Sequence, residues 1–306
     1  MLKVNNIKKS FNNKVVLNGV NLDIKQGEVY GLIGANGAGK TTLFNIIARV
    51  INSDDGVVIA DDKEISLAND IAGKIGYILD IPAMYEYLTA YEYLEFIASP
   101  LKLSKEEILE KSDAVLNEVG LKDCGKKKIK TFSRGMKQRM GIASGLISDP
   151  KIILMDEPSS ALDPMGRLDV LKIIENLKQK GKTIILSTHI LNDIERICDR
   201  VGLLVNGKIV IEGKINDVLD KYSYNIFSVY VKESNFDIVI DIAKTSDYFA
   251  SATKQKDCVD IEYLPGGKQE MFNLLGSIKL DCNGVIKKEQ SIEQIFILAS
   301  KENENV

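Results

Sequence analysis

The apolar residues of this chain form short uninterrupted runs in some places and a helical period in others. Short apolar runs bounded by turn residues indicate strands buried on both faces. Asn206-Gly207, between two such runs, is the strongest short-range signal for a hairpin. The strands predicted in this way are 4–11, 15–17, 20–24, 29–33, 75–79, 152–155, 183–186, 201–205 and 208–211, with a further hairpin over 56–65.

Helical periodicity fills the segments between several of these strands. A glycine-rich turn opens a helix at 40–50, and a second helix at 165–180 connects two buried strands. Between about 81 and 145 the pattern is helical, and capping boxes mark helix starts at Thr89 and Ser104. Strands that alternate with crossover helices predict a parallel sheet.

The last 84 residues of the chain, 223–306, have a different organisation. Short strands are predicted at 227–231, 258–263 and 285–288, and helices at 237–244, 269–275 and 292–300. This order is typical of a small α+β domain, and no catalytic group of residues stands out in it. We therefore predict a first domain at 1–222 and an accessory domain at 223–306.

Composition narrows the class of protein. Apolar residues make up 45% and charged residues 27%, as in ordinary globular chains. Lys and Arg total 40 against 43 Asp and Glu, so the net charge of -3 disfavours a nucleic-acid partner. Four scattered cysteines without metal-type spacing, in a chain with no secretory leader, predict reduced thiols. No apolar run is long enough to span a bilayer, so any membrane role needs another subunit.

Residues 34–41 read G-A-N-G-A-G-K-T and match the phosphate loop G-x-x-x-x-G-K-[ST]. Glycines let backbone N–H groups surround a phosphate, and the following helix presents its positive end. Lys40 should reach the β- and γ-phosphates, and Thr41 should hold Mg²⁺. The predicted nucleotide-binding residues of this segment are Asn36, Gly37, Ala38, Gly39, Lys40, Thr41 and Thr42.

The apolar run 152–155 ends in the acidic pair Asp156-Glu157. A strand that delivers Asp156 to a metal ion, with a carboxylate beside it aimed at water, meets the needs of phosphoanhydride hydrolysis. An acidic pair alone is more often a helix cap. Beside a phosphate loop, it predicts a hydrolytic site with Asp156 as a metal ligand.

A second phosphate-facing turn lies just before this strand. Residues 132–139 read F-S-R-G-M-K-Q-R, and residues 160–164 read S-A-L-D-P. Together with the phosphate loop, this order resembles the signature, Walker B and D-loop sequences of the ATP-binding cassette (ABC) ATPases. Arg134 and Met136 depart from the common L-S-G-G-Q form.

The resemblance covers about 1–222 and implies an α/β fold. The expected architecture is a P-loop NTPase cassette with a RecA-like parallel core, an antiparallel β subdomain and a helical subdomain at about 81–145. A small C-terminal α+β domain would follow. The implied activity is hydrolysis of ATP to ADP and phosphate, with Mg²⁺ as cofactor.

Several residue roles follow from the resemblance alone. Glu157 is implied as the general base, and His189, the one histidine, as the group that orients it and contacts the γ-phosphate. Phe11 matches the aromatic residue that stacks on adenine, although a core position is an alternative. Ser133 and Gly135 would meet the γ-phosphate of ATP held by a second copy of the cassette.

Asp80 is a departure from the family pattern. It stands where the family's Q-loop usually has a glutamine that contacts Mg²⁺ and the attacking water. A carboxylate about 6 Å from the γ-phosphate would cost roughly 3 kcal/mol at an effective dielectric near 20. We therefore expect Asp80 either to face Mg²⁺ as a ligand or to stay outside the site.

The signature variant and the motif at 290–296, Q-S-I-E-Q-I-F, look like those of bacterial subunits paired with separate membrane permeases. Such subunits export drugs, peptide antibiotics or polymers. The resemblance implies a dimer around two ATP molecules, a transmembrane permease partner and a location on the cytoplasmic face of the membrane. Met84, Tyr85 and Tyr87 could dock the permease or belong to the core.

Two other functions compete with this interpretation. A soluble ABC ATPase of translation or DNA maintenance usually carries two cassettes or a long insert, which this sequence lacks. A P-loop kinase or GTPase would leave residues 133–139 and His189 without a role. The transported substrate is open at this point.

Overall fold

The computed structural model describes residues 2–65, 73–160, 162–222, 226–264, 266–276, 282–288, 292–293 and 295–297. The chain divides into two compact units, the first reaching Ile215 and the second covering Asn216–Leu298. The division falls at the start of helix α7 (Ile215–Tyr222), whereas the boundary predicted from the sequence lies at its end.

A six-stranded sheet forms the centre of the first unit. Five of its strands are parallel, and β10 is antiparallel to β9 at one edge. Strands β3, β7 and β8 are buried along their whole length, as their apolar sequences predict. The strand order is β10 (Lys208–Lys214), β9 (Arg200–Val205), β3 (Val29–Ile33), β8 (Thr183–Ser187), β7 (Ile152–Asp156) and β6 (Ile75–Ile78).

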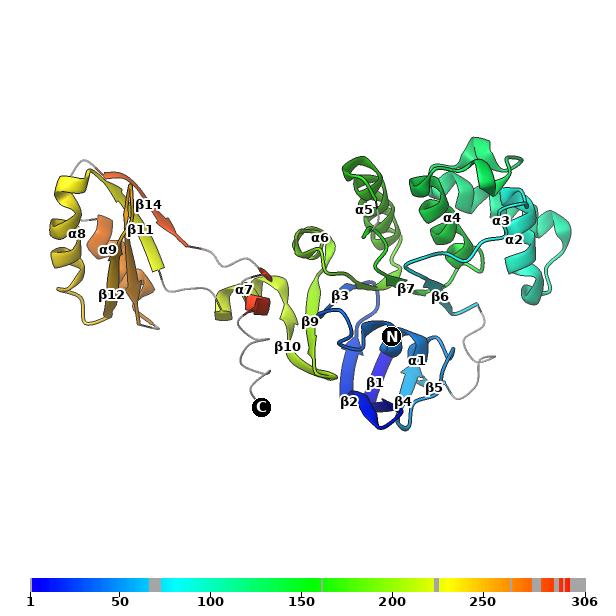
Figure 1. Cartoon of the computed structure of the whole chain (residues 1–306), viewed down its shortest axis with the longest axis horizontal. Helices are drawn as coiled ribbons and strands as arrows, with labels where there is room; N and C mark the ends of the chain where they lie inside the picture. The colour runs from blue at the N-terminus through cyan, green and yellow to red at the C-terminus, as the bar shows by residue number, and fades with distance from the viewer. Residues whose placement is uncertain are drawn as a thin grey trace. The chain divides into compact units, whose positions relative to one another are not determined.

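Helices and a second sheet cover this central sheet (Figure 1). One face packs against α5 (Pro164–Gln179) and α6 (Leu191–Ile197). The other contributes Tyr30, Leu154 and Ile185 to a core shared with α1 (Lys40–Ile47) and the second sheet. The second sheet is antiparallel, in the order β2 (Lys14–Ile24), β1 (Leu2–Phe11), β4 (Asp55–Ala60) and β5 (Lys63–Glu64).

The two strands expected at 15–17 and 20–24 are one continuous strand, β2. Its pairing with β1 shifts register where Ile7 faces Val20 and Lys8 faces Asn18. Gly19 lies between them with φ of 81°. A bulge at a glycine therefore explains the break that the sequence suggested, without interrupting the strand.

Three helices form the helical region beside β6 (Figure 1). Both predicted capping boxes are confirmed, Thr89 with Glu92 and Ser104 with Glu107. The prediction that helix begins near 81 is wrong, because Pro82 disfavours helix in the residue before it and residues 79–88 are not helical. The region contains α2 (Ala90–Ala98), α3 (Lys105–Glu118) and α4 (Arg134–Leu146), with 3₁₀ turns at Ser99–Leu101, Lys122–Cys124 and Ile129–Thr131.

The second unit is an antiparallel sheet with helices packed on it. Strand β12 was not predicted, because most of its side chains are exposed and its sequence lacks an apolar alternation. The predicted helix at 292–300 is helical at 292–293 and 295–297, and its other residues lie outside the described part. The sheet order is β12 (Phe249–Lys254), β13 (Val259–Tyr263), β11 (Ile226–Val231) and β14 (Cys282–Lys287); the helices are α8 (Phe236–Ala243) and α9 (Lys268–Gly276), with a 3₁₀ turn at Glu233–Asn235.

A buried carboxylate joins three segments of this unit. Asp260 accepts hydrogen bonds from Ser228 at 2.6 Å, Gln255 at 3.0 Å and Lys288 at 2.6 Å. Burial alone would raise the pKa of Asp260, but the hydrogen bonds from Lys288 and Ser228 outweigh it and lower that pKa. The ionised form of Asp260 therefore stabilises the folded unit.

We expect Lys288→Met to lower the free energy of unfolding by about 1–3 kcal/mol, because a buried carboxylate loses a partner. A folded-state pKa below the ordinary 3.8 makes this contribution complete above pH 3.8 and progressively lost at lower pH. Urea unfolding of the full chain between pH 7 and pH 3 measures it. Lys244→Met breaks an exposed pair with Asp241 and should cost under about 0.5 kcal/mol. A pH-independent loss for Lys288→Met would contradict the prediction.

Candidate active site

The loop between β3 and α1 has the backbone geometry of an anion site. Gly37 and Gly39 have φ of 82° and 110°, in the left-handed region that favours glycine. A Cβ on Gly39 would lie 2.8 Å from Leu17 Cδ2 and 3.1 Å from Val16 O, so no larger residue fits there. Helix α1 begins at Lys40 without a side-chain cap, which leaves its first N–H groups for a ligand.

Lys40 lies back over this loop. Its ammonium donates to the carbonyl oxygens of Gly34 at 2.7 Å and Ala35 at 3.3 Å, and only 7% of its surface is exposed. Glu157 Oε1 lies 3.8 Å from Lys40 Nζ. A buried cation held over a glycine loop is chemically able to bind phosphate oxygens.

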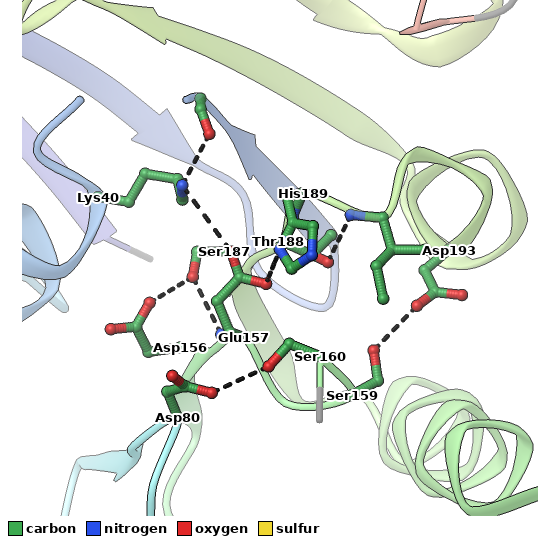
Figure 2. Close-up of polar contacts among 12 residues, drawn as sticks. Lys40, Asp80, Asp156, Glu157, Ser159, Ser160, Ser187, Thr188, His189 and Asp193 are labelled. Atoms are coloured by element: carbon green, nitrogen blue, oxygen red, sulfur yellow. Dashed lines mark hydrogen bonds and ion pairs between the residues drawn. The ribbon is translucent and has the colours of Figure 1, made fainter. Parts of the chain in front are cut away.

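Asp156 ends β7 and is 4% exposed. Its two carboxylate oxygens accept hydrogen bonds from Thr41 Oγ1 at 2.6 Å and from Ser187 Oγ at 2.5 Å. The predicted metal-binding pair, Thr41 and Asp156, is therefore brought together, although the two residues are far apart in the sequence. Figure 2 shows Asp156 beside Ser187, below the Lys40 side chain.

Glu157 follows in a left-handed conformation with φ of 47°. Its N–H bonds to both the carbonyl and the hydroxyl oxygen of Ser187, at 3.0 and 3.1 Å. This turn aims the carboxylate at His189, whose Nδ1 lies 2.8 Å from Glu157 Oε2 (Figure 2). The imidazole is 56% exposed, so it can meet a ligand while it holds Glu157.

Parallel pairing explains why these residues meet. Asp156 pairs with Ser187 in the β7–β8 register, so the residues that follow both strands emerge at the same edge of the sheet.

Burial and then the charge of Asp156 raise the pKa of Tyr77, whose hydroxyl donates to Asn45 at 3.1 Å. Tyr77 therefore stays protonated beside the site.

Ser187 is a site residue that the sequence reasoning did not identify. It is fully buried, and its hydroxyl links the carboxylate of Asp156 to the backbone N–H of Glu157. A serine at a strand end carries no signal of its own. Only the pairing register of two strands that are distant in the sequence reveals its position.

Phe11, Ser133 and Gly135 make no hydrogen bond or ion pair with this cluster in the described residues. Phe11 is 46% exposed at the end of β1, with the Lys9 ammonium 5.3 Å from its ring centre. Ser133 caps α4 by accepting from Met136 N at 3.3 Å. A Cβ added to Gly135 would meet no atom within 4 Å.

Asp80 follows β6, and its carboxylate is half-buried. Its Oδ1 accepts a hydrogen bond from Ser160 Oγ at 3.0 Å (Figure 2). Among the described residues, this is the polar contact that Asp80 makes, with none to Thr41 or Asp156. Both alternatives expected from the sequence, Asp80 as a ligand of Mg²⁺ and Asp80 outside the metal site, stay predictions.

Residues 17–160 match the family model described as ABC transporter. The lantibiotic transport ATP-binding protein SrtF of Streptococcus pyogenes is 42% identical over 212 residues, which are 69% of this chain and 90% of SrtF. The chain belongs to the ABC transporter family. The resemblance stated from the sequence is thereby confirmed, and this ABC ATPase is an ATP-binding and ATP-hydrolysing transporter subunit.

Other relatives of this ABC ATPase extend the match. The linearmycin resistance ATP-binding protein LnrL of Bacillus subtilis is 35% identical over 225 residues, 72% of this chain and 71% of LnrL. The uncharacterized ABC transporter ATP-binding protein all4389 of Nostoc sp. is 36% identical over 293 residues, 94% of this chain and 84% of the relative. That match includes the second unit.

Solved structures agree with the predicted fold class. The ATP-binding cassette MJ0796, a dimer in a post-hydrolysis state bound to ADP and Pi, has a TM-score of 0.64 and 29% identity. The match covers 70% of this chain and 99% of MJ0796. The α/β cassette fold is confirmed, and a translation or DNA-maintenance ATPase is not favoured.

We expect Ser187→Ala to lower the turnover number about 10- to 100-fold, because a hydrogen bond to a buried carboxylate is lost. The KM for ATP should change less, since the phosphate loop is intact. Steady-state phosphate release measures both. Ser112→Ala removes a buried hydroxyl that bonds Ile108 O within α3, and it should leave turnover unchanged. Wild-type turnover in Ser187→Ala would contradict the role of Ser187.

Proposed function

We propose that this ABC ATPase drives an exporter of drugs, peptide antibiotics or polymers, with Glu157 as the general base. The observation that carries the catalytic part is the meeting of Lys40, Glu157 and His189, with Glu157 Oε2 2.8 Å from His189 Nδ1 and Oε1 3.8 Å from Lys40 Nζ. The exporter class is supported by relatives named for lantibiotic transport and linearmycin resistance.

ATP would lie with its phosphates over the loop at 34–39. Lys40 would exchange part of its contact with the Gly34 and Ala35 carbonyls for the β- and γ-phosphates, and loop N–H groups would donate to the same oxygens. Asn36, Gly37, Ala38 and Thr42 complete the proposed cradle. Phe11, with nearly half of its surface exposed, is proposed to stack on adenine.

Thr41 and Asp156 fit a magnesium site. Their oxygen atoms lie 2.6 Å apart, and Mg²⁺ in phosphate sites usually takes one or two carboxylates together with substrate oxygens. In the described part of the chain, no group of three or more His, Cys, Asp or Glu is placed to hold a metal ion. Bound there, Mg²⁺ would neutralise charge on the phosphates.

Glu157 would accept a proton from the attacking water. Its backbone is fixed by Ser187, and its carboxylate is held by His189, so it is aimed before the nucleotide binds. His189 would keep Glu157 in place and contact the γ-phosphate with its exposed face. Preorganised polar groups of this kind lower the barrier without reorganising during the reaction.

A second copy would supply the remaining contacts. Ser133 and Gly135 are exposed or half-buried at the start of α4, and the space beside Gly135 is open. We propose that they meet the γ-phosphate bound by the loop of the other copy, in a dimer around two ATP molecules. The dimeric cassette MJ0796 supports this arrangement.

A separate transmembrane permease is the proposed partner, with the ATPase on the cytoplasmic face of the membrane. In the part of the chain that the structure describes, no helix has the length and apolar character needed to cross a bilayer.

Tyr85, Tyr87 and Phe96 form an exposed aromatic group. The ring centre of Tyr85 lies 5.9 Å from that of Tyr87 and 5.3 Å from that of Phe96. A neighbouring pocket of about 510 Å³ lies between β6, α2 and α4. We propose this surface for permease docking.

Glu157→Gln should lower ATP hydrolysis by at least about 10²-fold, because the general base is lost. ATP binding should persist, since the loop and Lys40 are unchanged, and the variant should elute as an ATP-dependent dimer in size-exclusion chromatography. Turnover at the wild-type rate would show that Glu157 is not the base.

Gly135→Asp in the Glu157→Gln background is the matched control for the dimer. The single chain has room for this side chain, and a carboxylate in the first turn favours the helix. The double variant should fold and bind ATP but remain monomeric, because the carboxylate would meet the partner's γ-phosphate.

Tyr87→Asp should release the subunit from membranes of cells that contain the permease, because it places a charge in the aromatic docking group. Tyr87 is 67% exposed, so the ATPase activity of the isolated subunit should be unchanged. Sedimentation of membranes followed by detection of the subunit measures the loss. Leu109→Glu, at a half-exposed position of α3, should stay bound.

A further inference from the structure

The turn that carries Glu157 is fastened at two adjacent serines. Ser160 N donates to Glu157 O at 3.3 Å and closes the turn. Ser159 Oγ donates to Asp193 Oδ2 at 2.9 Å, and Ser160 Oγ donates to Asp80 Oδ1 at 3.0 Å. Figure 2 shows the two carboxylates on opposite sides of this turn. In addition to the contacts of Glu157 with Ser187 and His189, the turn therefore has two side-chain anchors at its far end.

The two anchors have different surroundings. Asp193 is 2% exposed in the first turn of α6, and Arg167 Nε also donates to both of its oxygens, at 2.8 and 3.0 Å. Asp80 is half-buried, and Ser160 is its polar contact among the described residues. Asp193 therefore has Arg167 as a second hydrogen-bond partner besides Ser159. In the described residues, the side chain of Asp80 accepts its hydrogen bond from Ser160.

Asp80 lies between the central sheet and the helical region in the chain. Strand β6 pairs with β7 through Ile78 and Met155, so Asp80 leaves the sheet beside the residues that follow Asp156. The non-helical segment 79–88 then leads to α2. The hydrogen bond from Ser160 to Asp80 thus joins two segments: the turn that carries Glu157, and the segment 79–88 that leads from β6 to the helical region.

We infer that Asp80 is a positioning residue that holds Glu157 through Ser160, and that it acts as a hydrogen-bond acceptor rather than through its charge. The inference rests on the proposed role of Glu157. A general base must lie within hydrogen-bond reach of the water it activates, and a displacement of about 1 Å can cost 10²-fold in rate. Loss of one anchor moves the turn, while Thr41 and Asp156 keep their own contacts.

Three single variants and one double variant test this role in the full chain. Asp80→Ala and Ser160→Ala should each lower the turnover number by about tenfold, as expected for the loss of one hydrogen bond. Asp80→Asn keeps an acceptor oxygen and should stay within about threefold of wild type. Asp80→Ala/Ser160→Ala should lose no more than either single variant, because both remove the same contact.

Titrations of ATP and Mg²⁺ complete the measurement. The KM for ATP and the Mg²⁺ concentration that gives half-maximal activity should be unchanged in all four variants. Ser159→Ala provides the matched control, since Ser159 bonds a different carboxylate. Its effect should add to that of Asp80→Ala, in contrast to the effect of Ser160→Ala.

Each alternative result overturns the inference in a recognisable way. If Asp80→Asn is as slow as Asp80→Ala, or if either variant raises the Mg²⁺ requirement, the charge of Asp80 acts on the metal site. Additive losses for Asp80 and Ser160, or wild-type turnover in Ser160→Ala, would show that the hydrogen bond has no positioning role. Wild-type turnover in Glu157→Gln would instead overturn the proposed function itself.

Discussion

The parallel pairing of β7 with β8 is the constraint on which the arrangement of the candidate active site depends. It sets Asp156 opposite Ser187, so one buried hydroxyl fixes both the carboxylate of Asp156 and the backbone of Glu157. The next residues along β8 then bring His189 to Glu157. A slip of one residue would turn these side chains to the other face of the sheet. Four polar groups from two distant segments therefore share a single register.

Burial gives this arrangement its electrostatic strength. Lys40 and Asp156 are 7% and 4% exposed, and a buried charge is tolerated where polar partners surround it. Lys40 rests on two carbonyl oxygens, and Asp156 on two hydroxyl groups. These four hydrogen-bond partners are uncharged, and the Glu157 carboxyl oxygen Oε1 lies 3.8 Å from Lys40 Nζ. The folded chain thus holds both charges at the edge of the sheet where the nucleotide is proposed to bind.

The sequence predicts the parts of the chain whose structure is set locally. Buried strands appear as apolar runs, and the helix starts at Thr89 and Ser104 follow from capping boxes within four residues. Strand β12 escapes prediction because an exposed edge strand needs no apolar alternation. The phosphate loop and the acidic pair are visible as motifs. The role of Ser187 is not, because it arises from strand register. The contact of Asp80 with Ser160 likewise depends on tertiary structure. The sequence left open whether the Asp80 side chain faces the metal site or lies outside it.

The turn from Glu157 to Ser160 is in contact with two different parts of the first unit, helix α6 and the segment that follows β6. Glu157, at the start of the turn, has a φ of 47°, which is uncommon for residues other than glycine. The local sequence therefore does not favour the conformation of this turn. Its geometry is therefore imposed by neighbours, through Asp193 on the side of α6 and Asp80 on the side of β6. Because Asp193 is also tied to Arg167, it forms the more rigid of the two supports. The other support, Asp80, precedes the non-helical segment 79–88 that leads to α2, so it is the support through which Glu157 is connected to the helical region.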